Sequence, residues 1–139
     1  EAINQLSAQN KFLKSQTETH NEWGYASLKD VQKNCLDAGL DIESFSFLKG
    51  DVCETLKKPK NIPDQISILR LDTDWYESTK AELEILYPKL SNGGVLIIDD
   101  YGHWEGARKA VDEYFAMQKY KPLLNVIDRT GRSAIKFES

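Results

Sequence analysis

The chain has 139 residues, of which 40% are hydrophobic and 29% are charged, and its formal net charge is −4. This length suits one globular domain, and the acidic balance gives no general attraction to nucleic acid. No apolar run approaches the roughly 20 residues of a membrane-spanning helix, and the first residues lack the pattern of a signal peptide. We therefore expect neither nucleic acid nor a membrane among the partners.

The two cysteines, Cys35 and Cys53, form no CxxC motif. Two thiols in such a chain indicate a reducing compartment, so we expect a cytoplasmic protein. The sequence begins with Glu1, and its single methionine is Met117. From this we expect a fragment or a trimmed form of a longer protein, with residues 1–139 forming one partial domain.

The first third of the chain contains one clear helix and one candidate strand. Residues 1–25 are poorly patterned, and their weak apolar stripe predicts at most a loose helix. A helix should follow, because Ser27 and Asp30 have the spacing of a capping box and Gly39 supplies a left-handed stop. Residues 45–48 then alternate between apolar and polar positions, which predicts a strand.

The middle of the chain contains two apolar runs, residues 66–71 and 95–98, and acidic residues follow each of them. Apolar residues at helical spacing lie between the runs, from residue 83 to residue 90. Thr79 and Glu82 have the spacing of a second capping box. A strand, a helix and a strand in this order predict a right-handed crossover that joins two parallel strands.

The last part of the chain predicts a helix and a hairpin. Apolar residues recur at helical spacing between Ala107 and Phe115. Residues 123–127 and 134–137 have the composition of strands, and the short polar link between them favours an antiparallel hairpin. Together these elements predict the α/β class.

Three acidic residues stand directly after the two central strands: Asp72 after the first, and Asp99 and Asp100 after the second. The carboxyl ends of parallel strands share one edge of the sheet, which is where ligands bind in open α/β sheets. Carboxylates that converge repel one another unless a cation lies between them, and an all-oxygen set suits Mg²⁺. The alternative is that each acid only caps the next helix or turn.

Several stretches in this order resemble the macrocin O-methyltransferase family, whose members use S-adenosylmethionine and a metal ion. The central ones are LRLDTDWYEST, LYPKLSNGG, IIDDYG and ARKAVDEYF. The flanking ones are SLKDVQKN, FLKGDVCETL and VIDRTG, so the resemblance runs through residues 24–131. Acids after two successive strands also resemble, more distantly, the arrangement in catechol O-methyltransferase.

The resemblance implies a Rossmann-like class I methyltransferase sheet, mostly parallel with a C-terminal antiparallel hairpin. It implies that Asp72, Asp99 and Asp100 are ligands of Mg²⁺ or a similar divalent ion. Asp74 belongs to the same motif but would not contact the ion directly. For S-adenosylmethionine it implies contacts from Asp51, near its adenine, and from Asp72 and Thr73.

The resemblance also implies methyl transfer to a hydroxyl group of a small molecule, such as a sugar on a natural product or glycan. Relatives have a histidine base upstream of the acidic motif, which corresponds here to His20. His103, directly after the acid pair, is the alternative base. Either imidazole could instead be an ordinary surface group.

One part of the family pattern is missing from these 139 residues. There is no glycine-rich turn between a strand and a helix to hold the cofactor, since Gly93 and Gly94 open a strand instead. The acid that would bind the ribose is also absent. We therefore expect the sheet to lack its N-terminal strands. Re-paired strands, a second copy of the chain in a homo-oligomer, or the rest of a longer protein would close the gap.

Two other functions compete with methyl transfer. Asp72-Thr73-Asp74 is a DxD motif, which in sugar-nucleotide transferases holds a metal ion at a diphosphate. A non-catalytic assembly module that keeps a metal-stabilised fold is the second alternative. Nucleotide-sugar binding would support the first, and metal binding without cofactor binding would support the second.

Overall fold

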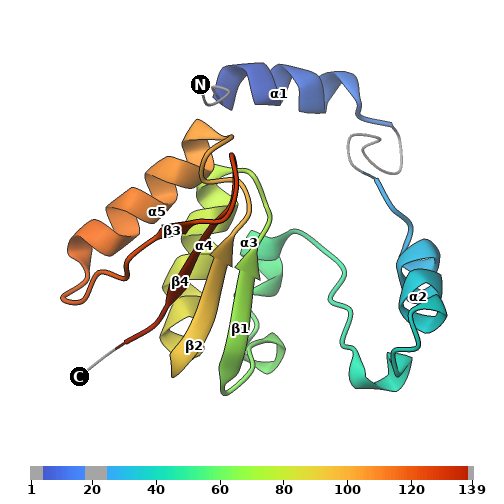
Figure 1. Cartoon of the computed structure of the whole chain (residues 1–139). Helices are drawn as coiled ribbons and strands as arrows, with labels where there is room; N and C mark the ends of the chain where they lie inside the picture. The colour runs from blue at the N-terminus through green and yellow to red at the C-terminus, as the bar shows by residue number, and fades with distance from the viewer. Residues whose placement is uncertain (1–4, 18–24, 138–139) are drawn as a thin grey trace. The chain divides into compact units, whose positions relative to one another are not determined.

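The computed structural model describes residues 5–17 and 25–137, and the chain divides into two compact units. One unit is Leu6–Lys49 and the other contains Gly50–Ser139. The first unit is built of helices and extended chain, whereas the second contains a four-stranded sheet (Figure 1). No helix among the described residues has the length and apolar character needed to cross a membrane.

The N-terminal part of the chain contains α1 (Gln5–Lys14), α2 (Leu28–Asp37) and the short 3₁₀ helix η1 (Ile42–Ser44). The predicted caps of α2 are confirmed. The Asp30 N–H donates to Ser27 Oγ at 3.1 Å, and the Gly39 N–H donates to the Leu36 carbonyl at 2.9 Å. Gly39 has φ +74°, the left-handed conformation that glycine adopts without steric cost.

The strand predicted at residues 45–48 is wrong. Phe45 has extended backbone angles, with φ −97° and ψ 139°, but no described strand pairs with residues 45–48. The alternating pattern therefore produced extended chain only, because a strand needs a neighbour to satisfy its backbone hydrogen bonds. The Phe45 and Phe47 rings instead stack on each other, with their centroids 6.0 Å apart.

The unit that contains Gly50–Ser139 has an α/β fold, as predicted. Its helices are α3 (Val52–Thr55), η2 (Pro59–Asn61), α4 (Tyr76–Leu86), η3 (Tyr87–Lys89) and α5 (Glu105–Met117). Its strands are β1 (Ile66–Leu71), β2 (Leu90–Ile98), β3 (Asn125–Val126) and β4 (Arg132–Ile135). The sheet order is β1-β2-β4-β3, with β1 and β2 parallel and the other two pairs antiparallel. The predicted crossover and C-terminal hairpin are therefore confirmed.

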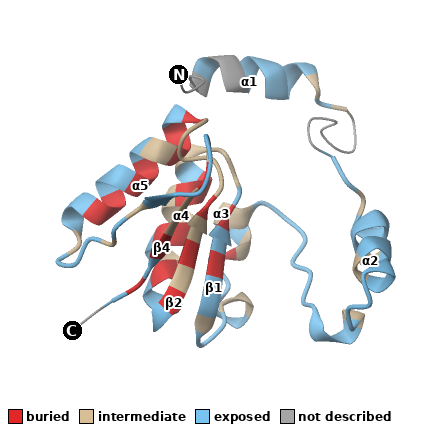
Figure 2. Cartoon of the chain, in the orientation of Figure 1, coloured by how far each residue is buried: buried red, intermediate tan, exposed pale blue. Residues whose placement is uncertain are grey.

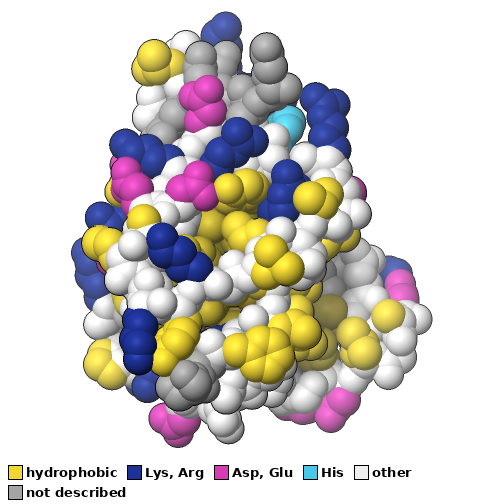
Figure 3. All heavy atoms as spheres, turned by 60° about the vertical axis from the view of Figure 1, so that its left-hand side comes forward, with side chains coloured by type: hydrophobic (Ala, Val, Ile, Leu, Met, Phe, Trp, Pro, Cys, Tyr) yellow, Lys and Arg dark blue, Asp and Glu magenta, His cyan; other side chains and the backbone are white. Residues whose placement is uncertain are grey.

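The core lies between one face of this sheet and the helices α4 and α5 (Figures 1 and 2). Both helices and the sheet contribute side chains with no exposed surface: Leu83 from α4, Leu96 from β2 and Val111 from α5 are each 0% exposed. The opposite face of the sheet is open, since Ile68 is 65% exposed and Ile135 is 47% exposed. Hydrophobic side chains also gather in the middle of the view in Figure 3.

Helix α4 begins earlier than its predicted capping box. The N-cap is Trp75, and the Thr79 N–H donates to the Trp75 carbonyl at 3.0 Å, inside the first turn. Thr79 and Glu82 are buried at 2% and 6% exposure rather than placed at the helix end. The spacing of Thr79 and Glu82 therefore reflects packing against the rest of the unit and not a cap.

Strand β2 begins earlier than the apolar run 95–98 that predicted it, because it also includes Gly93 and Gly94. The register with β1 shifts between the pairs Ile66–Leu90 and Ile68–Val95, which leaves extra residues on β2. Gly93, at φ +81°, supplies the left-handed backbone that such a bulge uses. The strand therefore pairs with β1 on both sides of this bulge, with a different register on each side.

A buried lysine directly after β4 connects this strand to the segment that follows α4. Lys136 is 4% exposed, and its Nζ donates to the carbonyls of Tyr87 at 3.2 Å and Pro88 at 3.4 Å. The same ammonium group lies 5.0 Å from the centre of the Tyr87 ring. These contacts satisfy carbonyls at the C-terminal end of α4, where a positive charge is favourable.

Candidate metal centre

The register of the parallel strands brings the acids together. Leu71 and Ile98 are register partners at the ends of β1 and β2, and the Asp99 N–H donates to the Leu71 carbonyl at 2.9 Å. The next residues, Asp72 and Asp99, therefore leave the sheet side by side. Asp100 follows immediately, before the chain turns toward α5.

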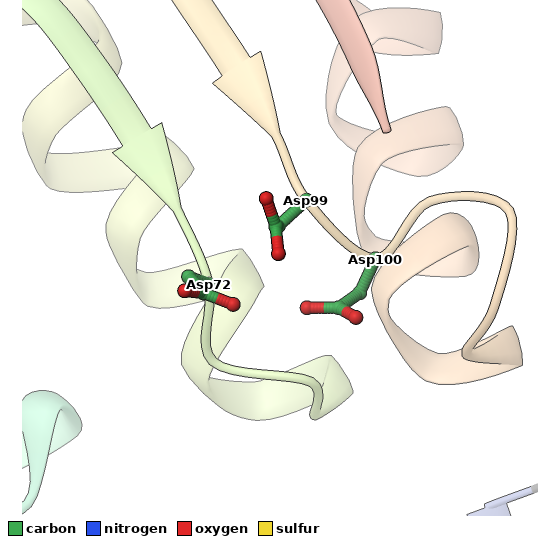
Figure 4. Close-up of side chains that lie close together, drawn as sticks. All are labelled: Asp72, Asp99 and Asp100. Atoms are coloured by element: carbon green, nitrogen blue, oxygen red, sulfur yellow. The ribbon is translucent and has the colours of Figure 1, made fainter. Parts of the chain in front are cut away.

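The structure groups the three acids that the sequence singled out. A carboxylate oxygen from each of Asp72, Asp99 and Asp100 lies within 4.8 Å of those from the other two. Figure 4 shows the three side chains pointing toward a common space between the two strand ends. Three hard oxygen donors in this arrangement match what Mg²⁺ or a similar divalent ion requires.

Asp100 provides the structural test of whether a cation fits. Its Oδ2 is buried and accepts no hydrogen bond from the described residues. Burial first, then the carboxyl group of Asp74, and then the charges of Asp72 and Asp99 raise the pKa of Asp100 to about 8. Burial and the Asp99 charge also raise the pKa of Asp72, while Arg70 opposes this shift. A buried carboxylate oxygen without a donor is what a bound cation would satisfy.

Arg70 was not singled out by the sequence, yet it contacts two of the three acids. Its Nη2 lies 2.8 Å from Asp72 Oδ2 and 3.0 Å from Asp99 Oδ1. Its guanidinium group is on the open face of the sheet, because its strand neighbours Leu69 and Leu71 are buried on the helix-covered face. The sequence signal was only an arginine between two apolar residues of a strand.

The turn between β1 and α4 is held by its own hydrogen bonds. Asp74 has φ +64°, and the Trp75 N–H donates to the Thr73 carbonyl at 2.6 Å. Ser78 Oγ donates to the carbonyls of Thr73 and Trp75, each at 3.1 Å. Left-handed backbone is uncommon outside glycine and concentrates at functional sites. The Asp74 carboxyl group is near enough to Asp100 to raise the pKa of Asp100.

Thr73, which the family resemblance places near the cofactor, has its hydroxyl committed inside the protein. Its Oγ1 donates to Glu82 Oε2 at 2.8 Å. Burial raises the pKa of Glu82 to about 7, the hydrogen bond from Thr73 opposes this shift, and the charge of Asp72 adds to it. Glu82 was read as a capping residue from the sequence, and its burial on α4 was not foreseen.

The loop that follows the acid pair packs against the C-terminal hairpin. The Gly102 N–H donates to the Thr130 carbonyl at 2.8 Å, and the His103 N–H donates to the Asp100 carbonyl at 3.0 Å. The His103 ring packs edge-on against Trp104, with the centroids 4.6 Å apart. His103, the alternative base, is therefore close in the chain to the acids and partly exposed.

Asp51, which the family resemblance places near the adenine of the cofactor, begins a helix in the structure. Asp51 is exposed and caps α3, since its Oδ1 accepts from the Cys53 N–H at 2.7 Å. A capping role does not use the second oxygen of this carboxylate. His20 lies outside the described residues.

A family model describes most of this chain. The model for macrocin-O-methyltransferase (TylF) matches residues 4–134. The matched span includes β1, α4, β2 and α5, and with them all three acids of the candidate metal centre.

Two curated enzymes are similar in sequence. Demethyldecarbamoylnovobiocin O-methyltransferase from Streptomyces niveus is 41% identical over 105 residues, which cover 76% of this chain and 39% of that enzyme. An O-methyltransferase from Streptomyces olivaceus, which acts on the 4′ position of 8-demethyl-8-(2,3-dimethoxy-alpha-L-rhamnosyl)-tetracenomycin-C, is 38% identical over 112 residues. That match covers 81% of this chain and 42% of the enzyme.

The fold is similar to that of a solved methyltransferase. The structure of the O-methyltransferase NovP superposes with a TM-score of 0.72 at 36% identity, covering 81% of this chain and 46% of that one. The chain thus spans less than half the length of these relatives. Sequence, order of elements and three-dimensional likeness agree, and the chain belongs to the macrocin-O-methyltransferase (TylF) family.

Proposed function

We propose that the protein to which this chain belongs transfers a methyl group from S-adenosylmethionine to a hydroxyl group, on a sugar carried by a natural product. The observation that supports this most directly is the convergence of Asp72, Asp99 and Asp100 within 4.8 Å, in a chain whose family and relatives are O-methyltransferases. The acceptor class is that of the Streptomyces olivaceus relative, which methylates a rhamnosyl group on tetracenomycin C.

We assign Asp72, Asp99 and Asp100 as the residues that hold a divalent cation such as Mg²⁺. The donor set supports this, since it offers carboxylate oxygens alone and one of them is buried without a hydrogen-bond donor. When bound, such an ion would supply Lewis acidity that lowers the pKa of an acceptor hydroxyl. The parallel strands fix the directions in which the three carboxylates leave the sheet.

The reaction moves one carbon and one proton. The bond from the methyl carbon to sulfur breaks, a bond to the acceptor oxygen forms, and sulfur keeps the electron pair as a neutral thioether. The hydroxyl proton must pass to a base. His20 and His103 remain candidates, and the structure adds Asp74, whose carboxyl group lies beside Asp100 on a left-handed turn.

The ligand assignment predicts the effect of replacing Asp99 with Asn. The substitution keeps the side-chain shape but removes an anionic oxygen, so the affinity for Mg²⁺ or Mn²⁺ should fall about tenfold or more. Isothermal titration with each ion measures this. Asp64→Asn is the matched control, because Asp64 is exposed and precedes β1, at the opposite end of the strand. Equal ion affinity of Asp99→Asn and Asp64→Asn would contradict the ligand set.

Activity is tested on the full-length protein. Methyl transfer to a glycosylated acceptor should be lost when EDTA is added and return with Mg²⁺. Undiminished transfer in EDTA would remove the metal from the proposal and leave methyl transfer in place. Absence of transfer to every hydroxyl acceptor, with intact folding and ion binding, would count against the function itself.

A further inference from the structure

Arg70 bridges the two strands that carry the acids. Besides its Nη2 contacts at 2.8 Å and 3.0 Å, its Nε donates to Asp99 Oδ1 at 3.3 Å. One guanidinium group therefore holds a carboxylate from the end of β1 and another from the end of β2. Such forked contacts fix the direction of a carboxylate as well as its charge.

Arg70 contacts only one oxygen of each of the two carboxylates that it holds. Arg70 contacts Oδ2 of Asp72 and Oδ1 of Asp99, so its ion pairs do not use the other oxygen of either carboxylate. Among the described residues, Arg70 pairs with Asp72 and Asp99 and not with Asp100, whose buried Oδ2 lacks a donor. A carboxylate that offers one oxygen to an ion and accepts a hydrogen bond on the other is the usual arrangement around a protein metal site.

We propose that Arg70 is a positioning residue that orients Asp72 and Asp99 for a divalent cation bound with Asp100. This inference rests on the metal site of the proposed function and deepens it. Arg70 contacts the acids and would not contact the ion itself.

Two effects of Arg70 on ion binding oppose each other. Its positive charge repels a cation, whereas its hydrogen bonds hold two ligands in place. The side chain of Arg70 is 55% exposed, so solvent and salt screen the repulsion. Loss of an outer partner of metal ligands typically costs about 10- to 100-fold in metal affinity. Orientation should therefore exceed repulsion.

The test is the sign of the change in ion affinity. The 139-residue chain and three variants, Arg70→Met, Arg70→Lys and Lys89→Met, are titrated with Mn²⁺ and the free ion is followed by electron paramagnetic resonance. Lys89→Met removes the same charge from an exposed residue just before β2, at the far end of that strand from Asp99. Each titration is repeated in about 0.5 M salt, which suppresses long-range charge effects.

Arg70→Met should bind Mn²⁺ about tenfold or more weakly, and the loss should persist in high salt. Arg70→Lys should recover only part of the affinity, since an ammonium group cannot reproduce the fork. Lys89→Met should bind as the unsubstituted chain does. If Arg70→Met fails to fold by circular dichroism, Arg70→Lys carries the test, with weaker binding than the unsubstituted chain expected.

Equal or tighter binding by the folded Arg70 variants would overturn the proposal and leave the metal site standing, because Arg70 would then act only as a competing charge. Absence of saturable Mn²⁺ binding by the unsubstituted chain would overturn the metal site, and the role of Arg70 with it. The two failures are thus distinguishable.

Discussion

Glu82 is a buried carboxyl group whose protonation is linked to folding. Its pKa is about 7 in the folded chain against 4.5 for an ordinary Glu, because burial disfavours the carboxylate. Between these values the folded chain binds more protons than the unfolded chain, so the free energy of unfolding falls as pH rises from about 4.5 to about 7. Above pH 7 the loss is complete. The neighbouring charge of Asp72 acts in the same direction.

Replacing Glu82 with Gln should therefore stabilise the chain at pH 8 and not at pH 4. Gln keeps an oxygen for the Thr73 hydroxyl and does not ionise, so the gain at pH 8 should be on the order of 3 kcal/mol. Urea unfolding across this pH range measures it. Glu84→Gln is the control on the same helix, since the Glu84 side chain is 50% exposed. Parallel stability curves for Glu82→Gln and the unsubstituted chain would contradict the linkage.

Sequence alone located the three acids but not the residues that surround them. The positions of Asp72, Asp99 and Asp100 follow from topology, because acids after in-register parallel strands must meet at one edge. The roles of Arg70 and Glu82 depend on which face of β1 and α4 is covered, and on how far a side chain reaches. Local spacing does not carry that information.

The loop after β2 and the hairpin turn contact through their backbones. A Cβ on Gly102 would lie 2.2 Å from the Arg129 carbonyl oxygen and 3.0 Å from Thr130 Cα. Gly102→Ala should therefore push the two segments apart and lower the free energy of unfolding by about 1–3 kcal/mol. Because Asp100 is two residues away, ion affinity should fall as well. Chemical denaturation and ion titration measure the two effects.

Gly131→Ala is the matched control in the same contact. Its added Cβ would lie 3.3 Å from a side-chain oxygen of Asp128, and no backbone atom is closer. We expect a change below about 1 kcal/mol. Similar losses for Gly102→Ala and Gly131→Ala would show that the close backbone approach is not what makes Gly102 necessary.

For the helices and strands, the sequence predicted the type of each element better than the residues at which it begins and ends. The crossover from β1 through α4 to β2 was recognisable because apolar runs and helical spacing alternate there. The start of α4 was missed because Trp75 caps it without a side-chain hydrogen bond, so no capping residue marks the place. The strand at residues 45–48 failed because pairing depends on a partner that the local pattern does not specify.

For the whole molecule, the missing glycine-rich turn has a measurable consequence. The sequence contains no recognisable glycine-rich turn between a strand and a helix, and the chain covers 39–46% of the length of its relatives. The 139-residue chain alone should bind S-adenosylmethionine weakly or not at all. Isothermal titration beside a full-length relative tests this. Micromolar affinity of the isolated chain would mean that its own residues complete the cofactor site.

The order of strands in the sheet also sets an order in time. β4 comes after β1, β2 and β3 in the chain, yet it lies between β2 and β3 in the sheet. A ribosome therefore releases β3 before the strand that joins it to the rest, and Lys136 emerges later still. Until then the carbonyls of Tyr87 and Pro88 lack their ammonium partner. The sheet of the nascent chain thus stays incomplete until β4 has left the exit tunnel. In a stalled chain that ends before Arg132, the edge of β2 that pairs with β4 would be exposed to chaperones.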